Sequence, residues 1–208
     1  MRYFVLINLL FLVAVMHSCR SSYSHLQPAE GNARVLDTFR PRFARVLYTT
    51  QVDVVGNHLS GFLLIKTMPD SSLRLVFSNE MGLKFFDFEF YRDGGFKVHH
   101  IIKKMDRKAV IKTLRNDFEL VLMRGLDSSN VKIFSDDRLL YYRFAQKKGY
   151  NYYITSKDGS QLIRMERSSK RKPVAIAVMS NYTAKVPDTI GITHKNFNFE
   201  IGLKRTDN

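Results

Sequence analysis

Apolar and polar residues alternate with a period of two along most of the chain, from Phe43 to the C-terminal end. Turn-forming residues separate the alternating runs: Gly56-Asn57, Pro69-Asp70-Ser71, Asp93-Gly94-Gly95 and Lys157-Asp158-Gly159. Such alternation places one face of a strand on a core and the other in solvent, as in antiparallel sheets. The 16 Phe and 10 Tyr residues also favour strands. We therefore expect one large antiparallel sheet that begins with a five-stranded meander.

The period changes once, between Asp106 and Met123. Apolar residues recur there at helical spacing: Val110, Leu114, Phe118 and Val121 or Leu122. We expect a helix with Asp106 as its N-cap, ending before Gly125, with its apolar stripe packed on the sheet. Alternating strands are expected to resume near Leu140, and Pro187 is expected to break the strand that begins near Val174. A β-rich α+β domain with one main helix follows from this pattern.

The first 18 residues have the features of a signal peptide. Arg2 precedes an apolar run from Tyr3 to Met16, which is too short for a stable membrane-spanning helix. The run ends in Met16-His17-Ser18-Cys19, which resembles the lipobox of bacterial lipoproteins, although Met16 and His17 depart from its commonest form. That resemblance implies cleavage before Cys19 and acylation of its thiol. An ordinary secretory signal with an incidental cysteine is the alternative.

Cys19 is the only cysteine in the chain, so the exported protein cannot form an internal disulfide. Acylation gives a lone exported thiol a role. Residues 20–42 are rich in Ser, Pro and Gly, with little periodicity. The expected organisation is therefore a signal peptide at 1–18, a lipidated tether at 19–42 and a folded domain at 43–208.

The chain is basic, with a formal net charge of +14 that falls to +13 when residues 1–18, and with them Arg2, are removed. The excess charge is either an ordinary solvated surface or a means of attraction to anionic lipid headgroups. Nucleic acid is not an expected partner, because the protein is exported and its basic residues are not gathered in one motif.

One segment carries a more specific similarity. Leu73 to Ser78 reads as a strand, Asn79-Glu80-Met81-Gly82 follows, and the next strand begins after Leu83. This order resembles the LolA/LolB family of lipoprotein carriers and receptors, in which such a strand ends in Asn-Pro-Leu-Gly. The run Val186 to Ile190, before the last strand, is similar to the end of the same family's domains. Glu80 stands in place of the family's Pro, and the family's usual Trp residues are absent.

The resemblance implies a curved half-barrel sheet with the helix on its concave face and an apolar cavity for the acyl chains of a lipoprotein. It also implies a membrane-insertion loop formed by Glu80, Met81, Gly82 and Leu83, with Met81 in the place of the family's protruding Leu. The expected cavity lining is Phe62, Leu64, Leu75, Phe77, Phe86, Phe88 and Phe90. These side chains could equally fill a core.

No catalytic motif is present: the sequence contains neither a Gly-x-Ser-x-Gly elbow nor a His-Glu-x-x-His helix. We expect no enzyme, no metal site and no cofactor. The favoured function is an anchored lipoprotein that binds lipid or lipoprotein acyl chains on the periplasmic side of a bacterial membrane, with the outer membrane preferred. The alternative is an anchored envelope interaction or assembly module without a ligand cavity.

Overall fold

The computed structural model describes residues 21–54 and 57–206. The expected signal peptide and Cys19 lie outside these residues. Within them, no helix is both long enough and apolar enough to cross a membrane.

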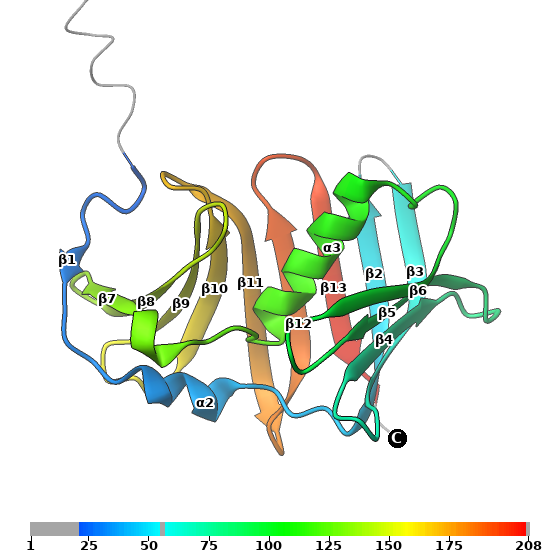
Figure 1. Ribbon diagram of the computed structural model, residues 1–208, viewed down its shortest axis with the longest axis horizontal. Helices are drawn as coiled ribbons and strands as arrows, with labels where there is room; N and C mark the ends of the chain where they lie inside the picture. The colour runs from blue at the N-terminus through cyan, green and yellow to red at the C-terminus, as the bar shows by residue number, and fades with distance from the viewer. Residues whose placement is uncertain (1–20, 55–56, 207–208) are drawn as a thin grey trace, which may run out of the picture.

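A single antiparallel sheet of 13 strands forms the body of the protein, in the order β1-β7-β8-β9-β10-β11-β12-β13-β2-β3-β4-β5-β6. The sheet curves but does not close, as in a half-barrel (Figure 1). The strands are β1 (Gln27–Pro28), β2 (Arg45–Val54), β3 (Asn57–Thr67), β4 (Leu73–Ser78), β5 (Lys84–Phe90), β6 (Phe96–Ile101), β7 (Lys132–Ser135), β8 (Leu139–Ala145), β9 (Tyr150–Ser156), β10 (Leu162–Ser168), β11 (Pro173–Thr183), β12 (Val186–His194) and β13 (Phe199–Arg205).

The main helix, α3 (Lys108–Val121), lies across the concave face of the sheet (Figure 1). Its buried residues recur at helical spacing, which confirms the helix expected from the sequence. The expected N-cap is wrong by one position, because Arg107 occupies the cap and its side chain makes no capping hydrogen bond. Three short helical turns complete the structure: η1 (Ala33–Val35), α2 (Leu36–Phe39) and η2 (Ser128–Asn130).

The meander β2 to β6 agrees with the sequence pattern, but β7 and β12 were not expected. Pro187, expected to end a strand, instead lies in β12, where it pairs with Tyr182 beside the β11–β12 hairpin. Its carbonyl accepts a 2.7 Å hydrogen bond from the Tyr48 hydroxyl. A proline is tolerated near the start of a strand, where few ladder bonds depend on its missing N–H.

Residues 21–42, expected to be a tether, are part of the folded domain. β1 pairs with β7 at the edge of the sheet, and the ring of Tyr23 stacks on Tyr152 with centroids 4.3 Å apart. The Tyr23 hydroxyl donates to Glu166, and Leu36 is buried in the main core. The composition of residues 21–42 suggested a linker. The contacts that order this segment are made with residues far away in the sequence, so they leave no local pattern.

Candidate functional site

A pocket of about 560 Å³ lies between the N-terminal half of α3 and strands β2, β3 and β13. Its walls are mostly apolar. The helix contributes Ala109, Val110, Thr113, Leu114 and Phe118, and the sheet contributes Thr50, Val52, Val54, Leu59, Leu63, Phe77, Phe86, Phe199 and Ile201.

The strand register explains why these side chains face the same space. Val52 pairs with both Ile201 and Leu59, and Leu63 pairs with Phe77. Cross-strand partners project from the same face of a sheet, and every second residue of a strand returns to that face. The period-two alternation of the sequence therefore builds the sheet wall of the pocket.

The pocket has a deep end and a mouth. Leu63, Phe77 and Phe118 are buried at the deep end. Exposed residues surround the mouth: Asn57, Lys104, Arg107, Ala109 and Phe197. Phe197 leaves 43% of its surface exposed, and the ring of Phe199 stacks on it with centroids 5.8 Å apart. The charged groups are at the entrance, and the interior is mostly apolar, with Thr50 as a buried polar residue in its wall.

The seven side chains expected to line a cavity occupy three different places. Phe77 and Phe86 line the pocket. Leu75, Phe88 and Phe90 share its face of the sheet but are buried in the core beside it. Phe62 and Leu64 alternate with Leu63, so they lie on the opposite, convex face. The run from Phe62 to Ile65 is apolar on both faces, and Leu63 is its pocket residue.

Aromatic packing fills the sheet next to the pocket. Phe86 stacks on Phe88 with centroids 4.4 Å apart and meets Phe118 of α3 at 5.8 Å. Phe77 contacts Phe85 at 4.8 Å. These rings form a continuous support under the deep end of the pocket.

A buried ionic cluster fixes the other half of α3, and sequence reasoning did not find it. Asp117 is fully buried and accepts hydrogen bonds from Arg167 of β10 at 2.9 Å and from His194 Nε2 of β12 at 2.7 Å. The small side chains of Ala175 and Ala177 on β11 are also buried, next to α3. The two basic groups lie 50 and 77 residues from Asp117 in the sequence, so no local pattern shows the cluster.

A second set of carboxylates lies on the convex face, behind the Phe-rich strands. Asp87 accepts two hydrogen bonds from the Arg74 guanidinium, at 2.8 and 2.9 Å. Glu89 accepts hydrogen bonds from Ser72, Tyr91 and His99. Hydrogen bonds from Ser72 and His99 lower the pKa of Glu89 from 4.5 to about 2. Both carboxylates are thus bound by donors on this face.

The expected membrane-insertion loop projects from the sheet between β4 and β5. Met81 is 92% exposed at its tip, and Leu83 is also exposed. The Asn79 side chain accepts hydrogen bonds from the backbone N–H groups of Met81 and Leu83, and Gly82 has a φ of 85°, which favours glycine. Glu80 is also exposed, and its carboxylate accepts a 3.1 Å hydrogen bond from Ser60.

Within residues 21–54 and 57–206, no group of three or more His, Cys, Asp or Glu side chains is placed to hold a metal ion. The chemistry that the pocket offers is contact with an apolar ligand. Its charged groups, Lys104 and Arg107, are at the mouth, where they could contact a polar ligand end.

Comparison with known proteins finds similarity at the level of structure. No family model and no curated protein matches the chain. A DUF1329 family protein from Desulfovibrio piger aligns with a TM-score of 0.44 and 10% identity, over 84% of this chain and 88% of that one. A structure from Vibrio parahaemolyticus, described as an outer membrane lipoprotein-sorting protein domain, aligns with a TM-score of 0.44 and 9% identity, over 85% and 90%. Neither score reaches 0.5, so neither protein assigns a role to any residue here.

Proposed function

We propose that this protein is a lipid-anchored envelope lipoprotein that binds acyl chains in the pocket under α3. The pocket carries the proposal: it is apolar inside, open at one end and about 560 Å³ in volume. Small-molecule sites span roughly 300–1,000 Å³ and have mostly apolar walls with few polar groups. An acyl chain fits this arrangement because it is apolar along its length and polar at one end.

The binding energy in this proposal comes from removing methylene groups from water. Each buried CH₂ contributes about 0.8 kcal/mol. The wall needs no directional contacts for this, which agrees with its Leu, Val, Ile and Phe side chains. The protein acts by binding, without a catalysed step, and the favoured cargo is an acyl chain of another lipoprotein on its way to the outer membrane.

Cys19 provides the anchor in this proposal, through acylation after removal of residues 1–18. The test is a Cys19→Ala variant followed by membrane fractionation and metabolic lipid labelling. The variant is expected to lose the lipid label and remain unprocessed. An unchanged label on the variant would rule out Cys19 as the acylated residue.

The pocket is tested by filling it. Val110→Trp places a large side chain in the pocket from α3, and Val178→Trp adds the same side chain at an exposed position. Displacing two methylenes of a bound chain costs about 1.6 kcal/mol, so we expect Val110→Trp to weaken binding of a fluorescent fatty acid at least about tenfold. Val178→Trp should bind normally.

Native mass spectrometry of the purified protein supplies the second readout. Lipid or acylated protein is expected to co-purify with the wild type and with Val178→Trp, and to be reduced for Val110→Trp. Equal fatty-acid binding by both variants, with no co-purifying lipid, would contradict the proposal and favour an interaction module without a ligand.

A further inference from the structure

Several loops meet at one end of the sheet. They are the segments 102–108, 146–149, 169–172 and 195–198. The strand register places the last three there, through the pairs Tyr150↔Ser168, Ser168↔Pro173, Ala175↔His194, Thr193↔Glu200 and Phe199↔Val54. The first segment joins them because Lys104 Nζ donates a 2.7 Å hydrogen bond to Asn57, whose partner across the strands is Val54.

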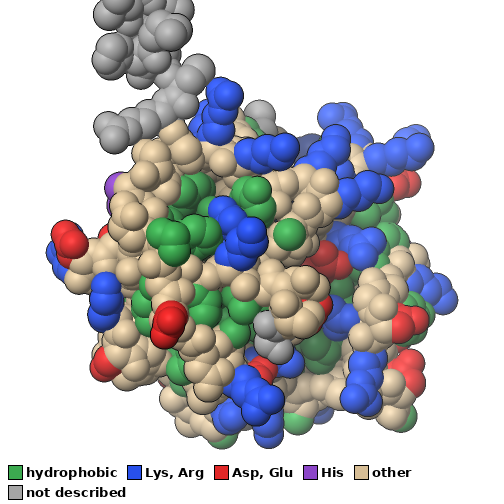
Figure 2. All heavy atoms as spheres, turned by 60° about the vertical axis from the view of Figure 1, so that its left-hand side comes forward, with side chains coloured by type: hydrophobic (Ala, Val, Ile, Leu, Met, Phe, Trp, Pro, Cys, Tyr) green, Lys and Arg blue, Asp and Glu red, His purple; other side chains and the backbone are tan. Residues whose placement is uncertain are grey.

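These four segments are strongly basic. They contain ten Lys or Arg residues against one acid, Asp106. All ten are exposed, and we call them the basic rim: Lys103, Lys104, Arg107, Lys108, Lys147, Lys148, Lys170, Arg171, Lys172 and Lys195. Lys and Arg side chains line the upper edge of the molecule in Figure 2. The next acids, Asp53 and Glu200, form a cross-strand pair further along β2 and β13.

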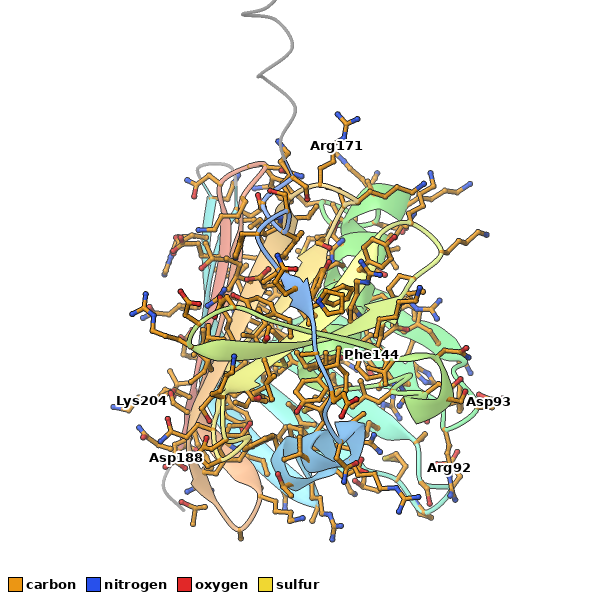
Figure 3. All side chains as sticks on the ribbon, turned by 90° about the vertical axis from the view of Figure 1, so that its left-hand side faces the viewer. Arg92, Asp93, Phe144, Arg171, Asp188 and Lys204 are labelled. Atoms are coloured by element: carbon orange, nitrogen blue, oxygen red, sulfur yellow. The ribbon has the colours of Figure 1, made fainter. Side chains whose placement is uncertain are left out.

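The opposite end of the sheet has mixed charge. Its loops carry Asp70 and Asp158 as well as Lys157 and Lys185, and Asp188 lies near the start of β12. Figure 3 shows Arg171 at the upper end and Asp188 toward the other. The excess of positive charge is therefore not spread evenly over the ends of the strands.

The basic rim includes one side of the pocket mouth and extends from it along the ends of the neighbouring strands. Lys104 and Arg107 belong both to the rim and to the pocket lining, and Phe197, which borders the mouth, follows Lys195 in the same loop. The N-terminal part of the described chain starts at this end too. The N–H of Ser22 and the hydroxyl of Ser21 both donate to the carbonyl of Arg171, at 2.7 and 3.1 Å.

We infer that the basic rim is a docking surface for an anionic bilayer, and that docking turns the pocket mouth toward the lipid headgroups. Lys and Arg near an anionic membrane are attracted to its phosphates, and the attraction falls off within about one Debye length. Exposed Phe197 then faces the membrane together with the mouth. An acyl chain could pass between the bilayer and the pocket without crossing bulk water.

This inference deepens the proposed function by assigning the membrane-facing end, and it differs from the loop expected from the sequence. Met81 is on the loop between β4 and β5, which we call the side loop, where Glu80 accepts a hydrogen bond from Ser60, three residues along β3 from Asn57. This loop is not among the four rim segments. A molecule docked through the rim does not need Met81 to enter the bilayer. The two orientations can therefore be distinguished by measurement.

The test uses the acylated full protein on vesicles, with one fluorescent label at a time. Acylation blocks Cys19, so single cysteines can be introduced by Ser169→Cys in the rim, Ala184→Cys at the opposite end and Met81→Cys in the side loop. Quenching by headgroup-labelled lipid is compared on phosphatidylglycerol–phosphatidylcholine and pure phosphatidylcholine vesicles, at low and high salt. We expect the Ser169→Cys label to be quenched most, on the anionic vesicles only, and less so in high salt.

Charge removal supplies the matched variants. Lys170→Gln/Arg171→Gln/Lys172→Gln removes three rim charges. Arg45→Gln/Lys66→Gln/Lys185→Gln removes three exposed charges at the other end, where Arg45 pairs with Lys66. Each well-placed basic residue contributes about fivefold to attraction, so the rim variant should lower the ratio of docked to undocked protein about 100-fold, and the other variant should behave as wild type.

Equal quenching at Ser169→Cys and Ala184→Cys, or equal effects of the two triple variants, would overturn the inference. Strongest quenching at Met81→Cys would also overturn it, in favour of the side loop. Fatty-acid binding by the same proteins is measured in solution without vesicles. If these proteins bind no fatty acid while the Ser169→Cys label is still quenched most, the proposed cargo is refuted and the docking surface is supported.

Discussion

The two halves of α3 rest on the sheet in different ways. The C-terminal half packs against β10 and β11, where Ala175 and Ala177 allow close approach and Asp117 binds Arg167 and His194. The N-terminal half lies over β2, β3 and β13 with a pocket of about 560 Å³ beneath it. One helix is thus fixed at one end and stands over open space at the other.

The two halves of α3 also differ in where the nearby charged side chains lie. Under the fixed half, ions are buried between helix and sheet. Behind the pocket half, Asp87 and Glu89 bind their partners on the convex face, so the concave face is left to apolar side chains. Apolar packing is non-directional and does not fix a helix at a distance from a sheet, whereas a buried ion pair with short hydrogen bonds does. The fixed half can therefore keep the pocket half open.

Removing the buried carboxylate should have the largest effect on this arrangement. Asp117→Asn leaves Arg167 without its counter-charge, and breaking one side of a buried ion pair costs about 3–5 kcal/mol. Urea unfolding measures the loss. The control is Glu119→Gln on the same helix, whose partly exposed pair with Arg115 is worth about 0.3–0.5 kcal/mol. Equal losses from the two variants would mean that the cluster does not fix the helix.

Adding volume should distinguish the halves directly. Ala177→Leu inserts methyl groups where side chains are close-packed, and we expect it to cost about 1–3 kcal/mol. Val110→Leu adds one methylene toward the pocket and should cost less than about 0.5 kcal/mol, because the space is open. Thermal unfolding of both variants measures the difference. A large loss for Val110→Leu would show that this half is also filled.

The convex-face carboxylates should respond to pH. Glu89 has a folded-state pKa of about 2, below its ordinary 4.5, so its stabilisation is complete above pH 4.5 and is lost as the pH falls toward 2. At pH 6 we expect the free energy of unfolding of the wild type to exceed that of Glu89→Gln by about 1–2 kcal/mol. This is less than the pKa shift alone implies, because nearby solvent screens the charge. Urea unfolding between pH 6 and 2.5 should show this difference shrinking. A constant difference would indicate that Glu89 acts through shape alone.

The smallest effect on stability is expected at the tip of the side loop. Met81 is 92% exposed, so Met81→Glu should change the free energy of unfolding by less than about 0.5 kcal/mol. If the loop enters the bilayer during delivery, the same variant should slow transfer of a bound acyl chain to liposomes. Unchanged transfer would remove the loop from the mechanism, and a large loss of stability would contradict its exposure.

The sequence predicted the elements whose pattern is local. Strands β2 to β6 and helix α3 show clear periods, and the structure confirms them. The pocket wall was harder to assign, because the run from Phe62 to Ile65 is apolar at every position and does not show which face is inside. Pro187 suggested the end of a strand. The strand β12 accommodates it because it lies beside the hairpin, and the sequence pattern does not show that position. Arg167 and His194 lie 50 and 77 residues from Asp117 in the sequence, so only the fold brings them into contact with it.

The folded N-terminal segment affects how strongly the proposed basic docking surface contacts the membrane. A loose tether of some two dozen residues would allow a root-mean-square distance of about 25–30 Å between anchor and domain. Ser22 is held at Arg171, and the three residues from Cys19 to Ser22 can span at most about 10 Å. The volume open to the domain shrinks roughly with the cube of that ratio, by about twentyfold. The effective concentration of Arg171 and its neighbours at the headgroups rises by the same factor, so weak, salt-sensitive contacts can orient an anchored molecule although they would not retain a free one.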